Sequence, residues 1–283
     1  MRGIILTGGP AEALGPLTRA VSKQLLPVYD KPMLCYPLAG LIQAGIREVL
    51  VITAPEDLPH VQRFGDGHEI GMRLEYAAQP DPGDVDQAIG TGLDFIDNAP
   101  VALIAGDGIF HGEDFVSVSS LIADFAAAPK GAKIYTHRVA TRHRNTVRAG
   151  LYLYDDQAAG IARSLIPSQR SATGLHRVSA HYTRAGQLTE ILLYAGTAWL
   201  SVHTAEDLDR ASVWVRTIED RQGIKIGCVE EAAWRAGLID AEQLRELAEP
   251  LRKSGYGQYL LNLLNCGPGQ QLRSLASPGE TTR

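Results

Sequence analysis

The chain has 283 residues, of which 45% are hydrophobic and 21% are charged, a composition that is typical of a globular protein and argues against extensive disorder. The formal net charge of −5 argues against nucleic-acid binding, which depends on clustered Lys and Arg side chains. No apolar stretch approaches the roughly 20 residues that span a bilayer, and the chain opens without a signal-peptide pattern. The sequence therefore predicts a cytoplasmic protein with a small-molecule ligand and with no nucleic-acid or membrane partner.

The three cysteines are widely separated, odd in number and free of any CxxC pair: Cys35, Cys228 and Cys266. This pattern predicts unpaired thiols in a reducing compartment and argues against a structural zinc site.

Short apolar runs alternate with helical patterns in the first half of the chain. Strands are predicted at residues 4–6, 49–53, 73–76 and 101–104, with helices between them at 33–44, 56–64 and 85–96. This order is typical of βαβ units. The predicted fold is therefore α/β, with a mostly parallel central sheet and helices on both faces.

The second half continues the pattern and then becomes helical. Strands are predicted at 133–139, 148–154 and 188–200, the last broken near Gly196, and helices at 114–127, 157–164 and 205–220. Short helices follow at 230–236, 241–247 and 257–264. We predict a single domain at residues 1–266, with an elaborated helical C-terminal part at 227–266 and a flexible tail at 267–283.

A pair of glycines follows the first predicted strand. Leu6 leads through Thr7 to Gly8 and Gly9, at the sheet edge where helix N-termini and glycine-rich loops offer backbone N–H groups to phosphate. Two glycines after a strand are a weak signal by themselves, since most such pairs form a tight turn.

The longer context of this pair resembles bacterial glucose-1-phosphate thymidylyltransferases of the sugar-1-phosphate nucleotidyltransferase family. The resemblance covers residues 3–9, residues 17–33 around Ser22-Lys23-Gln24-Leu25-Leu26-Pro27, and further segments as far as Tyr256-Gly257-Gln258-Tyr259-Leu260. It implies a Rossmann-like nucleotidyltransferase fold and a homo-oligomer, a dimer or a tetramer. The implied reaction is attack of a sugar-1-phosphate oxygen on the α-phosphorus of a nucleoside triphosphate, giving an NDP-sugar and pyrophosphate.

Site residues follow from the same resemblance. Lys23 matches a phosphate-binding cation, and Asp107 matches one of two carboxylates that hold Mg²⁺. Glu12 and His203 are further catalytic candidates, because they can donate or accept protons beside the matched positions. The predicted ligand-binding residues are Leu6, Gly8, Gly9, Gln24, Gln79, Asp84, Gly106, Gly150, Tyr152, His176, Trp199 and Ser201.

Several matched positions differ from the family pattern. Ala11 and Ala13 stand where the phosphate loop has glycine and arginine, and Ser201 stands where the second Mg²⁺ carboxylate is expected. The stretch before Gly150 is shorter than in the family. These changes predict weaker contacts with triphosphate, metal and sugar, because an arginine that grips phosphate in a bidentate manner has no substitute in alanine.

Three functions stay open on the sequence alone. We favour a repurposed protein that has lost sugar-nucleotide synthesis and binds or transforms another small molecule, as in natural-product biosynthesis, by metal-independent acid–base chemistry and without a cofactor. Asp86 and His111 join its candidate groups, although Asp84 and Asp86 would equally serve as a helix cap and first-turn acid. The alternatives are an active nucleotidyltransferase that uses Mg²⁺ and a non-catalytic regulatory or assembly paralogue.

Overall fold

The computed structural model describes residues 1–7, 12–19, 21–81, 83–112, 117–138, 146–165, 177–194 and 196–266. The predicted tail at 267–283 lies outside the described residues. Within the described part of the chain, no helix is both long and apolar enough to cross a membrane.

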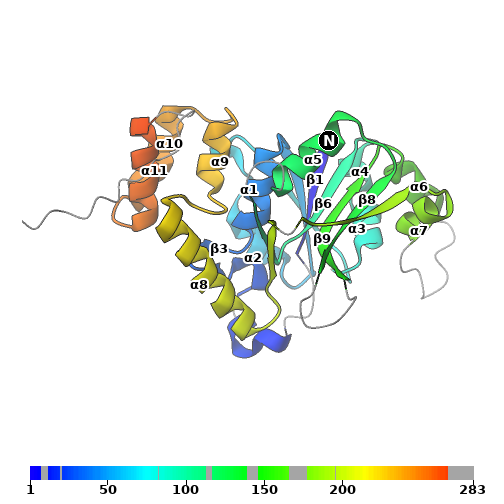
Figure 1. The fold of residues 1–283 in the computed structure, drawn as a ribbon, viewed down its shortest axis with the longest axis horizontal. Helices are drawn as coiled ribbons and strands as arrows, with labels where there is room; N and C mark the ends of the chain where they lie inside the picture. Colours follow the sequence, from blue (N-terminus) through cyan, green and yellow to red (C-terminus); the bar gives the residue numbers. More distant parts are fainter. Residues whose placement is uncertain are drawn as a thin grey trace, which may run out of the picture.

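A seven-stranded sheet forms the centre of the molecule, in the order β10-β8-β9-β6-β1-β4-β5 (Figure 1). Its strands are β1 (Arg2–Thr7), β4 (Glu48–Thr53), β5 (Arg73–Ala78), β6 (Val101–Ala105), β8 (Ala132–Arg138), β9 (Thr146–Tyr154) and β10 (Leu188–Leu192). Only the pairs that involve β9 are antiparallel. The predicted α/β fold with a mostly parallel sheet is confirmed.

Successive residues of each strand point to opposite faces of the sheet, and each face carries its own core. Ile5 packs into the core of one face, and Ile4 and Leu6 pack into the core of the other. The first face is covered by α1 (Cys35–Gln43) and α5 (Val118–Ala127). Its core continues into α9 (Val229–Arg235), which packs against α1, and into α10 (Ala241–Ala248) and α11 (Gly255–Cys266), which pack against α9. The second is covered by α3 (Val85–Thr91), α4 (Leu93–Ile96), α6 (Ala158–Leu165) and α7 (Arg177–Arg184).

The C-terminal helices α9 to α11 lie at one end of the molecule, and α6 and α7 lie at the other (Figure 1). Val229, Trp234 and Leu260 share one buried cluster with Ile5 and Leu38 of the N-terminal half. This continuous core supports our proposal that residues 1–266 form one domain.

Two short sheets, the 18-residue helix α8 and several short helices complete the described fold. The sheets pair β2 (Pro27–Val28) with β3 (Lys31–Pro32) and β7 (Gly108–His111) with β11 (Ala198–Ser201), both antiparallel. The helices are α2 (Leu58–Val61), α8 (Ala205–Gln222) and the 3₁₀ helices η1 (Glu12–Thr18), η2 (Lys23–Leu25), η3 (Gln62–Phe64), η4 (His68–Ile70) and η7 (Glu249–Leu251).

Some predicted elements differ in extent from the observed ones, and one observed α-helix was not predicted. The segment 188–200 forms two strands in different sheets, and the helix at 85–96 is divided into α3 and α4 at Gly92. The helix at 56–64 forms only the short α2 and η3, and the one at 114–127 begins at Val118, which Ser117 caps. The sequence missed α7, because only Val178 and Tyr182, four residues apart in a polar segment, are buried.

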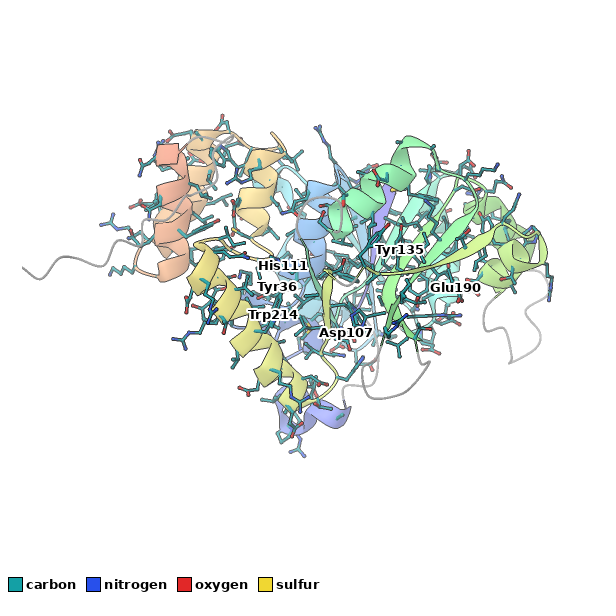
Figure 2. The ribbon with its side chains drawn as sticks, in the orientation of Figure 1. Tyr36, Asp107, His111, Tyr135, Glu190 and Trp214 are labelled. Atoms are coloured by element: carbon teal, nitrogen blue, oxygen red, sulfur yellow. The ribbon has the colours of Figure 1, made fainter. Side chains whose placement is uncertain are left out.

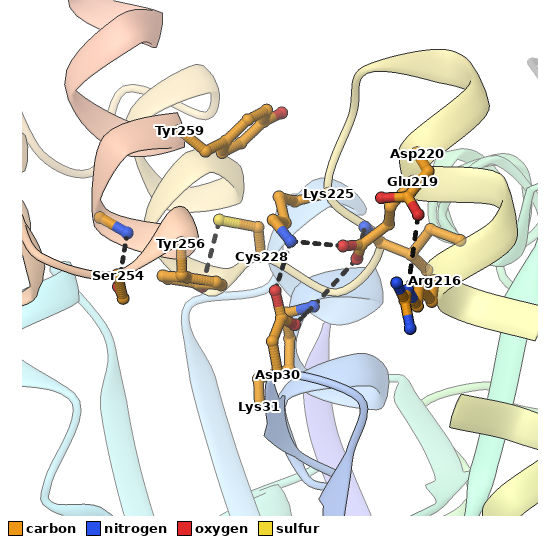
Figure 3. A network of polar contacts seen from close by, with 12 residues as sticks. Asp30, Lys31, Arg216, Glu219, Asp220, Lys225, Cys228, Ser254, Tyr256 and Tyr259 are labelled. Atoms are coloured by element: carbon orange, nitrogen blue, oxygen red, sulfur yellow. Dashed lines mark hydrogen bonds and ion pairs between the residues drawn. The ribbon is translucent and has the colours of Figure 1, made fainter. Parts of the chain in front are cut away.

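A cluster of four charges ties the β2–β3 hairpin to α8 (Figure 3). Lys31 and Glu219 are buried in it, and the side chains of Lys225 and Asp30 are 12% and 20% exposed. The carboxylate of Glu219 accepts hydrogen bonds from Lys31 Nζ at 3.0 Å, Lys225 Nζ at 2.6 Å and the backbone N–H of Ile226 at 2.9 Å. Asp30 pairs with both lysines from the other side. Each charge in the cluster thus has partners of opposite sign, which is the condition for burying charges without a large penalty.

Candidate functional site

The centre of the site is an ion pair at the carboxyl edge of the sheet. Asp107 directly follows β6 and Gly106, whose N–H donates to the carbonyl of Leu6 at 2.9 Å (Figure 2). Lys23 begins η2, and its Nζ lies 2.7 Å from Asp107 Oδ2. The side chains are 2% and 12% exposed, so the two predicted catalytic residues meet in a largely buried position.

The β7–β11 pair brings a second chain segment beside Asp107. Ser201 lies opposite Gly108 in this pair, and the N–H of Val202 donates to the carbonyl of Asp107 at 3.0 Å. His203 follows, and its Nδ1 lies 3.5 Å from Asp107 Oδ2, while 58% of its side chain is exposed. The sequence reasoning therefore placed Ser201 and His203 at the correct edge.

The start of α8 holds His203 in place. Thr204 is the N-cap, and its hydroxyl accepts from the N–H of Asp207 at 3.1 Å. Asp207 Oδ2 in turn accepts from the N–H groups of His203 at 3.2 Å and Thr204 at 3.0 Å. Burial alone would raise the pKa of the Asp207 carboxyl, but these hydrogen bonds lower it below its usual range. A charged Asp207 therefore fixes the backbone beside the ion pair.

The two predicted glutamines are buried and already hydrogen-bonded. Gln24 Oε1 accepts from the hydroxyl of Ser22 at 2.9 Å. Gln79 follows β5, and its Nε2 donates to the carbonyls of Asp81 at 2.5 Å and Asp84 at 3.1 Å. A base that binds at Gln79 would have to compete with this turn, so its predicted ligand role stays a prediction.

Asp84 and Asp86 serve local structure. Asp84 caps α3 by accepting from the N–H groups of Asp86 at 2.9 Å and Gln87 at 3.1 Å. Asp86 Oδ1 accepts from the N–H and the hydroxyl of Ser179 at 3.3 and 3.1 Å. The capping alternative therefore describes Asp84 better than the predicted ligand role does.

Leu6, Tyr152 and Gly150 have packing roles in the structure, and their assignment to ligand binding stays a prediction. Leu6 and Tyr152 lie in the second core with 6% and 8% of their surface exposed, and burial raises the pKa of Tyr152. Gly150 has φ +78°, and a Cβ there would lie 2.6 Å from the Cβ of Ala105. A glycine is required at this position because β9 passes so close to β6.

The remaining candidates are placed as follows. The ring of Trp199, in β11, lies 5.4 Å from that of His137. His111, another candidate group, belongs to β7, with its ring 5.5 Å from that of Trp214 (Figure 2). Glu12 begins η1. Gly8, Gly9, Ala11 and His176 lie outside the described residues.

Sequence reasoning missed a threonine at the same sheet edge. Thr53 ends β4 opposite Thr7 of β1, and its buried hydroxyl has no hydrogen-bond partner within the described ranges. Thr7 Oγ1 instead donates to the carbonyl of Ile52 at 2.9 Å. The sequence did contain a signal for this residue, because Thr53 is a polar residue that ends an otherwise apolar strand.

A divalent cation would find one carboxylate here. Over the described part of the chain, no group of three or more His, Cys, Asp or Glu side chains could form a metal cage. Mg²⁺ accepts one carboxylate together with substrate phosphates and waters, so Asp107, with Ser201 beside it, fits that mode of binding.

Comparisons with known proteins identify the class to which this sheet, with its lysine–aspartate pair at the carboxyl edge, belongs: it is a nucleotidyl transferase. The nucleotidyl transferase family profile matches residues 2–143. Glucose-1-phosphate thymidylyltransferases from an Actinoplanes species and from Mycolicibacterium smegmatis are 47% and 46% identical, over 94% of this chain and 95% and 99% of theirs.

A solved structure from Bacillus anthracis, named for glucose-1-phosphate thymidylyltransferase and in complex with sucrose, is also similar. It is 29% identical with a TM-score of 0.65, and the match covers 76% of this chain and 95% of that one. The chain therefore belongs to the glucose-1-phosphate thymidylyltransferase family, as its sequence motifs indicated.

Proposed function

We propose that the protein is an active sugar-1-phosphate nucleotidyltransferase, which joins a nucleoside triphosphate to a sugar 1-phosphate and releases pyrophosphate. The observation that carries this proposal is the buried Lys23–Asp107 pair at the carboxyl edge of the sheet. Thymidine triphosphate and glucose 1-phosphate are the proposed substrates, because they are the substrates for which the similar proteins are named.

We propose different roles for the positively and the negatively charged residues of the site. Lys23 is held at 2.7 Å from Asp107 in the described state, and we propose that it turns to an incoming phosphate group when substrate binds. Asp107 is then free to hold Mg²⁺, with Ser201 beside it. A bound Mg²⁺ would supply positive charge against the negative charge that develops around the α-phosphate under attack and on the leaving pyrophosphate. The chain's own part is to position these groups.

The hypothesis of a lost or replaced reaction has less support than this active alternative. It rests on Ala13, on Ser201 and on the shortened stretch before Gly150. None of the names of the relatives reported above points to a different reaction. The substitutions instead predict slow turnover, because each lost transition-state contact costs on the order of 10² to 10³ in rate.

The test is NDP-sugar formation from thymidine triphosphate, glucose 1-phosphate and Mg²⁺, followed by chromatography and pyrophosphate release. We expect turnover by the unaltered chain and roughly tenfold to 10³-fold faster turnover in Ser201→Asp, which restores a second carboxylate beside Asp107. Ser201→Asn is the matched control, since it adds similar bulk without charge. Ala13→Arg, with Ala13→Gln as its control, should also accelerate the reaction.

An unaltered chain without measurable turnover would contradict the proposal. If Ser201→Asp then gained activity, the result would favour the lost-reaction hypothesis, with the scaffold still competent. We also propose a homo-oligomer, a dimer or a tetramer, and light scattering of the purified chain at several concentrations tests it; a monomer throughout would rule it out.

A further inference from the structure

One oxygen of Asp107 faces two nitrogen atoms from separate parts of the chain. Oδ2 lies 2.7 Å from Lys23 Nζ and 3.5 Å from His203 Nδ1. The ammonium of Lys23 shows that this oxygen faces a position that accepts a cation. Ser201, at the neighbouring point of β11, brings no charge of its own.

The spacing between Asp107 and His203 suits two ligands of one metal ion. Donors that each lie about 2.0 to 2.2 Å from one ion are separated by roughly 3 Å, close to the 3.5 Å between Oδ2 and Nδ1. His203 needs little movement, because its backbone N–H is fixed to Asp207 and its ring is 58% exposed.

We infer that Asp107 and His203 bind a divalent first-row transition metal, Mn²⁺ or Co²⁺, in preference to Mg²⁺. An imidazole nitrogen suits transition metals, and their affinity for such sites rises from Mn²⁺ to Co²⁺. Mg²⁺ takes oxygen ligands and gains little from an imidazole. The inference deepens the proposed function, on which it rests, by naming the metal that this site selects.

Lys23 regulates access to this metal position. Its ammonium and a divalent ion both require Oδ2 of Asp107, and two cations at one buried oxygen repel each other. A phosphate group that draws Lys23 away removes the competitor. Metal and nucleotide therefore strengthen each other's binding, and the effect is reciprocal because it is a coupling free energy.

The experiment measures metal binding directly, without turnover. Mn²⁺, Co²⁺ and Mg²⁺ are titrated by calorimetry, Mn²⁺ also by electron paramagnetic resonance, and Co²⁺ by its visible absorption. Each titration is run with and without a non-hydrolysable analogue of thymidine triphosphate. His203→Phe keeps a planar ring but removes the nitrogen donor. His181→Phe, at an exposed histidine on α7, is the matched control.

We expect the unaltered chain to bind Mn²⁺ and Co²⁺ more than about tenfold more tightly than Mg²⁺. His203→Phe should lose at least about tenfold in affinity for both transition metals, because even the loss of a group that only orients a metal ligand costs about 10- to 100-fold. The affinity for Mg²⁺ should change little. Lys23→Met should bind metal more tightly than the unaltered chain when nucleotide is absent. His181→Phe should behave as the unaltered chain does.

The inference would be overturned if His203→Phe and the unaltered chain bound Mn²⁺ with equal affinity. It would also be overturned if no metal binding were detected, either with or without the nucleotide analogue. The proposed function stands apart from this outcome. Mg²⁺-supported turnover without His203-dependent binding would refute only the inference. His203-dependent binding without NDP-sugar formation would refute only the proposed function.

Discussion

The charge cluster around Glu219 allows a quantitative test of how the hairpin is held. In Glu219→Gln the side chain keeps its shape but loses its charge, while Lys31 and Lys225 stay buried at 4% and 12% exposure. Two of the three hydrogen bonds that Glu219 accepts come from the ammonium groups of these lysines, so both partners in each bond are charged. Hydrogen bonds between charged groups contribute about 1.5 to 3 kcal/mol each. If both bonds were lost, the free energy of unfolding would therefore fall by up to about 6 kcal/mol.

Asp30 reduces this loss, because it still pairs with both lysines. Removing one partner of a buried ion pair lowers the free energy of unfolding by about 3 to 5 kcal/mol. For Glu219→Gln we expect a value near the lower end, about 3 kcal/mol. Asp30→Asn should cost less, because the side chain of Asp30 is 20% exposed and that of Glu219 only 3%.

Urea unfolding followed by circular dichroism measures the difference as a shift in midpoint at constant slope. Glu242→Gln is the control, because its pair with Arg245 lies on the surface with 68% of the Glu242 side chain exposed. That change should cost less than about 1 kcal/mol. A Glu219→Gln variant within about 1 kcal/mol of the unaltered chain, or one less destabilised than Asp30→Asn, would refute the reasoning.

Two further predictions concern the sheet. Gly150→Ala should destabilise the fold by about 2 to 5 kcal/mol, the sum of a left-handed alanine and an overlap with Ala105. Gly160→Ala, with open space around it, should not destabilise the fold, and urea unfolding of both variants checks this. Burial, followed by the charge of Asp124, raises the pKa of the Tyr135 hydroxyl from 10.0 to about 12. The unfolded chain therefore loses this proton at a lower pH than the folded chain does. The free energy of unfolding should fall as the pH rises from 10.0 to about 12. Tyr135→Phe should flatten the decline in urea midpoint, whereas the same change at the exposed Tyr194 should not; an unchanged slope in Tyr135→Phe would contradict the argument.

The strands β1, β4 and β6 could be predicted from the sequence because they are apolar runs buried on both faces, whereas the edge strands β5 and β10 are partly exposed. Predicted and observed bounds agree within two residues at β1 and β4. The short β7 escaped prediction because Gly108 and His111 break its pattern. Its pairing with β11 joins residues about ninety positions apart, which local patterns do not encode.

The site was predictable in part for a related reason. Lys23 and Asp107 were expected at one edge, but their direct contact depends on how η2 packs against the end of β6. The burial of Tyr152 in the second core was not predicted, because the face to which a strand residue points depends on register. Asp84 was ambiguous, since a carboxylate before a helix suits both a cap and a ligand.

Because β9 runs antiparallel to its neighbours, the connection between β8 and β9 is a suitable position for an engineered insertion. β8 ends at Arg138 and β9 begins at Thr146, and both points lie at the edge of the sheet that carries Asp107. A transplanted connection of greater length could therefore be anchored there without altering any strand pairing. Doubling a flexible connection costs only about 0.6 kcal/mol of closure entropy, so new sugar contacts could be grafted onto this chain at little cost in stability.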